Sequence, residues 1–307
     1  MSQTRNQLSL DLKSIVDYEV GEQGKRHKAL TDQISTRIAV DAAYKTFAQK
    51  QGMSVLNEMN EFGAFDIDTV QDAYDKQVKM RKFGLAAKIS NEAIADNQAR
   101  DLAAYIGKEL KRCEAETLDI HQAELFNEAT NTAARYLYLD GKPMLSTTHE
   151  SQYNSQSNRL AVDADLSEDA LEDIVHLMNA VQSISGRKEV IQPDRVIIHP
   201  DQLEEYIRIT AFSERYATTD RDGNANKKLG RFQRDPITSV YLSDTDAIYV
   251  LTDQNSGMDG FVFLDREPFS TKMVDDESTD SFNIYSKRRH AFFMGNWRSV
   301  FGTVGAA

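Results

Sequence analysis

A long stretch without proline, from Phe83 to Thr130, constrains the fold of this chain more than any other part of its sequence. A short apolar run ends at Ile89, and Ser90 and Asn91 then follow, two residue types that commonly cap the N-terminus of a helix. Apolar residues recur beyond them at helical spacing, on roughly one face. About forty residues of helix would measure on the order of 60 Å at 1.5 Å per residue. We therefore predict one long helix with a buried apolar face.

The apolar face of this predicted helix includes the chain's single cysteine. A role in the core is the simplest one for that thiol, because free cysteine behaves as a small apolar residue. Gly107 is the one weak helix former, and it costs about 1 kcal/mol relative to alanine. The residues assigned to the buried face are Ile94, Leu102, Ile106, Leu110 and Cys113, with Ile120 and Leu125 further along.

The length of the chain and of this helix together limit the fold class. With 307 residues the chain is long enough for about two domains. The helix exceeds the average of about eleven residues several-fold, yet the sequence has no sustained heptad and no second helix of that length. The rest of the chain is rich in short strand patterns. We therefore predict an α+β protein in which the long helix lies across a sheet.

The segments before the helix differ in character. Residues 1–59 suggest helical pieces with polar connectors, and Ile34, Ile38 and Phe47 follow a helical spacing. This segment is either a helical subdomain or an arm that packs on neighbouring subunits. Residues 60–88 alternate as strands do and become locally basic. They form either a solvated hairpin or an extended loop that reaches an acidic neighbour. The candidate contact residues in it are Lys76, Lys79, Arg81 and Lys82.

The segment after the helix mixes short helices and strands. We predict helices at about 166–183 and from Pro200 to Ile209. Strands are predicted at 196–198, 240–242, 248–251 and 261–264, and four more beyond Pro268 at 269–274, 282–285, 291–294 and 300–304. Helices and strands in this order form an α+β unit.

Charge and composition exclude several classes of protein. The formal net charge of −12 leaves no overall basic surface for gripping nucleic acid. A single cysteine rules out an intrachain disulfide framework. The first residues contain no apolar segment typical of a secretory signal, and no run approaches the roughly 18 apolar residues of a membrane span. We expect a protein that folds in a reducing cytoplasm and does not cross a membrane.

Motifs for catalysis, metals or cofactors are not found in the sequence. The histidines form no HExxH pattern and do not combine with Cys113 at metal-binding spacing. A phosphate-binding loop, a dinucleotide fingerprint and a GxSxG elbow are all missing. His149 could be drawn as a catalytic base, but without a nucleophile nearby in sequence a hydrogen-bonded structural histidine is the better interpretation. We predict no cofactor, no metal and no enzymatic activity.

A series of short motifs resembles the major capsid proteins of tailed bacteriophages, including Mu-like head subunits. The run from Phe83-Gly84 to Ile89-Ser90 is similar to a family strand, and the helix after it has the family's early Asp96 and final Phe126-Asn127. The remaining matches are Asp140, Gly141, Leu145, Ser146 and His149 in one segment, and Pro193, Val196 and Pro200 in another. The resemblance extends in order over about residues 35–305.

The resemblance implies the Hong Kong 97-type capsid fold. Mapped by order, an N-terminal arm covers 1–59, an extended E-loop 60–89, and a P-domain with the long helix 90–163. An A-domain covers 164–266, and the P-domain strands return at 267–307. Lys76, Lys79, Arg81 and Lys82 would then lie on the loop that contacts neighbouring subunits.

The resemblance also implies a function. Such a chain would self-assemble, by way of a procapsid, into pentamers and hexamers of an icosahedral head enclosing double-stranded DNA, which it would not bind sequence-specifically. A separate scaffolding protein, a portal and head-completion proteins would be its partners. The virion would be its location, after assembly in the host cytoplasm. An encapsulin-like compartment shell with the same fold is the alternative, followed by a cytosolic enzyme with His149 near its centre.

Overall fold

The computed structural model describes most of the chain. The described residues are 5–26, 30–50, 52–53, 56–59, 65, 67–68, 72–90, 92–93, 96, 99–149, 155–212, 224–232, 234–276, 278–279 and 281–306. The chain forms two compact units. Unit 1 comprises Met1–Lys45, Lys79–Gln122 and Phe263–Phe292, and unit 2 comprises Thr46–Val78, Ala123–Val262 and Phe293–Ala307.

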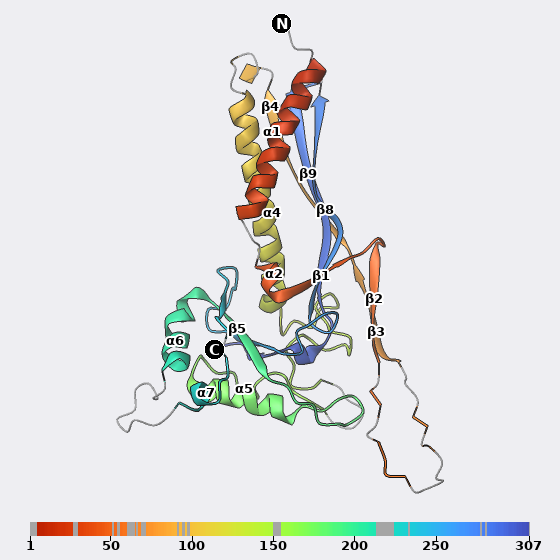
Figure 1. The fold of residues 1–307 in the computed structure, drawn as a ribbon, viewed down its shortest axis with the longest axis vertical. Coiled ribbons are helices and arrows are strands. Elements are labelled where there is room, and N and C mark those ends of the chain that lie inside the picture. Colours follow the sequence, from red (N-terminus) through yellow and green to blue (C-terminus); the bar gives the residue numbers. More distant parts are fainter. Residues whose placement is uncertain are drawn as a thin grey trace. The chain divides into compact units, whose positions relative to one another are not determined.

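Unit 1 consists of helices packed on one face of a four-stranded sheet. The strand order is β1 (Ser35–Ala39), β8 (Phe261–Asp276), β9 (Ser281–Met294) and β4 (Arg81–Ser90). Figure 1 shows α1 (Arg5–Arg26) and α4 (Ala99–Asn127) lying along this sheet, and a single turn, α2 (Thr31–Ile34), precedes β1. The last turn of α4 and one end each of β8 and β9 belong to unit 2.

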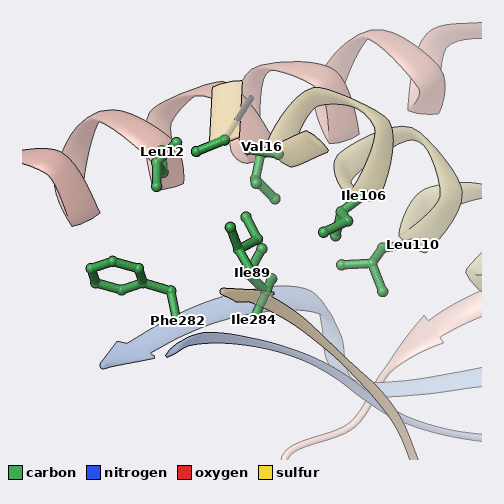
Figure 2. Close-up of a cluster of buried hydrophobic side chains, with 9 residues drawn as sticks. Leu12, Val16, Ile89, Ile106, Leu110, Phe282 and Ile284 are labelled. Carbon is green, nitrogen blue, oxygen red and sulfur yellow. The ribbon is translucent and has the colours of Figure 1, made fainter. Parts of the chain in front are cut away.

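The core of unit 1 lies between these helices and the sheet. Leu12 and Val16 of α1 and Ile106 and Leu110 of α4 meet side chains of β4 and β9 (Figure 2). The sheet contributes Ile89, Phe282 and Ile284. Burying each large apolar side chain contributes about 1.5–3 kcal/mol, so this cluster is a main source of the stability of unit 1.

The long helix is shorter than the sequence predicts. α4 has 29 residues and begins at Ala99, which at 1.5 Å per residue makes it about 44 Å long. The predicted start at about residue 90 is wrong, because Asp96 lies in a turn and α4 begins after it. Ser90 caps a separate helical turn instead, where its Oγ accepts a hydrogen bond of 3.3 Å from the backbone N–H of Ala93.

The residues predicted for the buried face of α4 differ in their exposure. Ile106 and Leu110 are buried, Leu102 is partly buried against the same cluster, and Cys113 is partly exposed. Ile94 lies outside the described residues. Ile120 is 47% exposed, so its predicted burial is wrong.

Residues 35–50, predicted as helical, form strands. β1 joins the sheet of unit 1, and the backbone N–H of Val40 donates to Asp265 O at 3.0 Å. β2 (Tyr44–Lys50) alternates between exposed and less exposed residues. The spacing of apolar residues in this segment fits both a helix and a strand. Pairing with neighbouring strands decides in favour of the strand.

Strands β2 and β3 (Asp72–Lys79) form a separate two-stranded sheet. Residues 51–71 connect them. The strand pattern predicted at Phe62 and Val70 falls outside the described residues, and the described Phe65 and Ile67 are not in a strand. β4 follows β3 directly and confirms the strand predicted from Phe83 to Ile89.

Unit 2 contains a four-stranded sheet with short helices. The strand order is β10 (Val300–Thr303), β7 (Ile248–Thr252), β5 (Pro193–Ile198) and β6 (Ile237–Thr238), with β5 and β6 parallel and the other neighbours antiparallel. The helices are α5 (Glu168–Ala180), α6 (Leu203–Ala211) and α7 (Ala225–Lys228), with single 3-10 turns η1 (Pro200–Gln202) and η2 (Trp297–Ser299).

Most predicted elements of this part are confirmed. Ser167 caps α5 by accepting from the backbone N–H of Ala170 at 3.1 Å. The strands after Phe261 merge into the longer β8 and β9. The strand predicted at 240–242 is wrong, because the chain turns there and Ser239 Oγ accepts from the N–H of Tyr241 at 3.3 Å. No helix of the described residues is both long and apolar enough to cross a membrane.

Candidate assembly surfaces

The segment between β2 and β3 exposes large apolar side chains. Leu56 is fully exposed, Phe65 is 82% exposed and Ile67 is 91% exposed. The same segment, residues 51–71, contains Glu58, Glu61, Asp66 and Asp68 and no lysine or arginine. We call residues 51–71 the loop tip. It combines negative charge with apolar side chains that water surrounds in the single chain.

The four basic residues predicted as subunit contacts do not lie in the loop tip. Lys79 ends β3, and Arg81 and Lys82 begin β4, all three exposed. Arg81 lies over the ring of Phe83, 5.0 Å from its centroid. The strands hold these three charges at or beside the sheet of unit 1, and their role as subunit contacts stays a prediction.

Lys76 is held within unit 2. It is half-buried in β3, and its Nζ donates to Ala134 O at 3.2 Å and to Leu137 O. It also lies 5.5 Å from the centroid of the Phe293 ring. Burial lowers the pKa of Lys76 below its usual value. In the single chain this lysine therefore anchors the hairpin to its own subunit.

The sheet of unit 1 has a basic face directed away from the helices. Opposite residues of an antiparallel pair share a face, and the register places Lys82 opposite Arg289 and Gly84 opposite Lys287. The intervening pairs, such as Phe83 with Arg288, face the core. We call the exposed side, made by Lys82, Gly84, Ala86, Lys88, Tyr285, Lys287 and Arg289, the outer sheet face.

An acidic residue of β8 contacts this face. Glu267 of β8 accepts from Lys287 Nζ and from Arg289 Nη1, both at 3.1 Å. Hydrogen bonds from Lys287 and Arg289 lower the pKa of the Glu267 carboxyl, so it stays ionised. Among the described residues that define the outer sheet face, Lys82, Lys88, Lys287 and Arg289 outnumber the bound carboxylate of Glu267. The face is therefore positive in a chain whose net charge is −12.

The one histidine considered as a catalytic base has a structural environment. His149 in unit 2 is fully buried and stacks on Trp297 with ring centroids 4.6 Å apart. Its Nδ1 contacts Asp140 Oδ2 at 2.7 Å and its Nε2 contacts Asn158 Oδ1 at 3.1 Å. Both ring nitrogens are thus occupied, which fits a histidine that holds a loop in place. Within the described part of the chain, no group of three or more acidic, histidine or cysteine side chains is arranged to hold a metal ion.

Sequence reasoning missed the outer sheet face and the acidity of the loop tip. The sequence does contain the signal for the acidity of the loop tip, because residues 51–71 include four acidic residues and no lysine or arginine. The outer sheet face could not be seen in the sequence, because it forms only when β4 pairs with β9 and brings together residues some two hundred positions apart.

Comparison with solved structures shows the fold. The procapsid protein of bacteriophage JBD30 matches with a TM-score of 0.56 and 13% identity, over 99% of this chain and 77% of that one. The protein of Microbacterium phage Oxtober96 matches with a TM-score of 0.57 and 10% identity, over 91% of each chain. A virus-like particle from Pyrococcus furiosus matches with a TM-score of 0.51 and 12% identity, over 95% of this chain and 97% of that one. These similarities confirm the Hong Kong 97-type fold.

Sequence comparison shows the family. No curated protein matches the chain. The sequence model described as "Phage capsid protein" matches residues 73–302, well over half of the chain. The chain therefore belongs to the phage capsid protein family, as its motifs predict.

Proposed function

We propose that this capsid protein builds the closed icosahedral head of a tailed bacteriophage, as pentamers and hexamers around double-stranded DNA. Its family and its fold support the structural role. A negative net charge suits the wall of a DNA container, since an acidic surface does not retain the packaged phosphates. We further propose that it catalyses no reaction and assembles in the host cytoplasm with a separate scaffolding protein, a portal and head-completion proteins.

The exposure of three large apolar side chains in the loop tip is the observation that carries the assembly role. A single soluble chain has no reason to leave Leu56, Phe65 and Ile67 almost fully exposed on one segment. Each would contribute about 1.5–3 kcal/mol if a neighbouring copy covered it. We therefore propose that the loop tip binds an adjacent subunit in the shell.

Charge favours the outer sheet face of the neighbouring copy as the surface that receives it. The loop tip has four acidic residues, and the outer sheet face has Lys82, Lys88, Lys287 and Arg289. This reverses the direction expected from the sequence, in which a basic loop reaches an acidic neighbour. Opposite charges on the two surfaces would orient the subunits before the apolar contacts form.

The strands also suggest where the extended loop begins and ends. The predicted E-loop, 60–89, includes β3 and β4, whereas β2 falls within the predicted arm. Because β2 pairs with β3, we propose that the loop consists of residues 44–79 and that β4 is part of the P-domain sheet. The other predicted segments are retained as proposals.

Substitution of the apolar loop tip tests the assembly role. We expect Leu56→Ser, Phe65→Ser and Ile67→Ser together to leave a folded subunit with an unchanged melting temperature that no longer forms shells in electron micrographs. The matched control changes three exposed apolar residues elsewhere in unit 2, Val162, Val190 and Leu229, which are 80%, 81% and 64% exposed. The control should assemble. Normal shells from the loop-tip variant would refute the proposal.

A compartment shell of the same fold is the alternative function, and a match in fold alone does not separate the two. The contents of particles isolated from the producing cell separate the two functions. A phage head contains double-stranded DNA and one portal vertex, while a compartment shell encloses a cargo protein. Particles filled with a single protein and lacking DNA would favour the compartment.

A further inference from the structure

Two histidines connect α4 to β9 inside unit 1. His121 Nδ1 of α4 lies 3.2 Å from His290 Nε2 of β9. A hydrogen bond at this distance needs one nitrogen to donate and the other to accept, so the accepting ring must be neutral. If both rings carry a second proton, both nitrogens become donors and the contact turns repulsive.

The surroundings of His290 disfavour a charged ring. His290 is 2% exposed and lies among the rings of Phe83, Phe263 and Phe292, with centroids 4.6, 5.7 and 5.5 Å away. Within the described residues its Nδ1 has no hydrogen-bond partner. Burial, followed by the charges of His121, Arg288 and Arg81, lowers the pKa of His290 to about 3.

The charged groups named around His290 do not compensate a second proton on its ring. Arg81 of β4 lies directly opposite His290 in the sheet, and Arg288 is two residues away on β9. The carboxylates that α4 and β8 contribute to this region, Glu114 and Asp265, both bind Arg288. Asp265 also binds Arg37 of β1. These acids are thus already engaged with arginines.

We propose that the His121–His290 contact is an acid-sensitive latch between α4 and the sheet of unit 1. When one proton is shared between the facing nitrogens, the contact holds the helix to β9. When each ring takes up a further proton, two cations face each other at hydrogen-bond distance in a buried site. The latch is a property of the single chain and does not depend on shell assembly.

The direction of the pH effect follows from proton binding. The unfolded chain protonates His290 near its ordinary pKa of 6.5, whereas the folded chain resists protonation until about pH 3. Between these values the unfolded state binds more protons, so folding stability falls as the pH falls. The contribution of His290 is fully present above pH 6.5. For one such histidine, the unfolding equilibrium constant rises about tenfold between pH 7.5 and pH 5.5.

Urea unfolding of the unassembled full-length chain tests the latch. Helix content would be followed by circular dichroism at pH 7.5 and 5.5 at equal ionic strength. His290→Gln keeps a hydrogen-bonding partner for His121 but cannot take up a proton. The acid-induced rise in the unfolding equilibrium constant should be about tenfold smaller in this variant than in wild type. His176→Gln, at an exposed position on α5, is the matched control and should behave as wild type.

A second variant and a direct titration keep the test decisive if His290→Gln fails to fold. His290→Phe places an apolar ring among the three phenylalanines and should lose the same pH dependence. Nuclear magnetic resonance of the wild-type histidine ring protons should show no titration of His290 between pH 7.5 and 5.5. The proposal is overturned if His290 titrates near pH 6.5, if a folded His290 variant keeps the wild-type pH dependence, or if the control loses it equally.

Discussion

Arg288 illustrates at the scale of a residue how unit 1 accommodates charge in its core. Its guanidinium binds Glu114 on α4 and, at 3.1 Å, Asp265 on β8. Lys111 binds the other oxygen of Glu114 at 2.6 Å, and Arg37 binds Asp265. Burial, followed by the charge of Arg37, lowers the pKa of Arg288 to about 10. Each buried charge therefore has a partner, which is the condition for keeping it ionised away from water.

Removing this arginine should destabilise the subunit. Arg288→Met preserves the aliphatic length but leaves two buried carboxylates with one cation each. We expect the free energy of unfolding to fall by about 3 kcal/mol, at the lower end for breaking a buried pair, because Lys111 and Arg37 remain. Arg112→Met removes an arginine paired with Glu116 at 3.0 Å on the exposed face of α4 and serves as the control. Equal stabilities of the two variants in urea unfolding would contradict this account.

Gly107 shows at the scale of an element why α1 and α4 can pack closely. A Cβ at this position would lie 2.9 Å from Val16 O and 3.1 Å from Glu19 Cβ, both on α1. From the sequence, Gly107 is only a weak point in a helix. In the structure its missing side chain is what allows the backbone of α1 to approach α4.

Alanine at two helical glycines should therefore act in opposite directions. Gly107→Ala gains helix propensity but forces α1 and α4 apart, and overpacking costs typically 1–3 kcal/mol, so we expect a net loss of stability. Gly21 lies in α1, and a Cβ there would meet nothing within 4 Å. Gly21→Ala should raise stability by up to about 1 kcal/mol. Thermal unfolding of both variants by circular dichroism checks the signs, and a stabilising Gly107→Ala would show that the helices do not need the close approach.

The arrangement of charge matters at the scale of the whole molecule. In the proposed contact, the acidic and apolar loop tip of one copy meets the basic outer sheet face of the next. Two such surfaces on each subunit allow a chain of contacts that can close into a shell. Electrostatic attraction between them should weaken as salt rises, because charges more than about 10 Å apart are screened at 0.1 M ionic strength.

Reversing charge on the outer sheet face should impair assembly more than folding. We expect Lys82→Glu with Lys88→Glu, two exposed lysines of this face, to slow shell formation at low salt, measured by light scattering, with a melting temperature close to wild type. Lys227→Glu with Lys228→Glu on α7 changes the net charge equally at another exposed site. Equal loss of assembly in both would assign the effect to net charge rather than to the outer sheet face.

Local patterns in the sequence were sufficient for the α+β class, the existence of α4, the strands after Phe261 and the capsid family. Those properties depend on neighbouring residues, on periodicity and on the order of motifs along the chain. The strands at 35–50 could not be predicted, because the pairing of β1 with β8 and of β2 with β3 outweighs the helical spacing of their apolar residues.

Only the tertiary structure decided which residues of the long helix are buried, which lysines are exposed and which buried charges form pairs. Lys76 and Lys79 look alike in sequence, yet one is held by carbonyl oxygens of unit 2 and the other is exposed. His121 and His290 are separated by 169 positions and share one hydrogen bond. The physical reason is that burial, hydrogen bonding and charge pairing depend on residues brought together by folding, whereas helix and strand patterns are written locally in the chain.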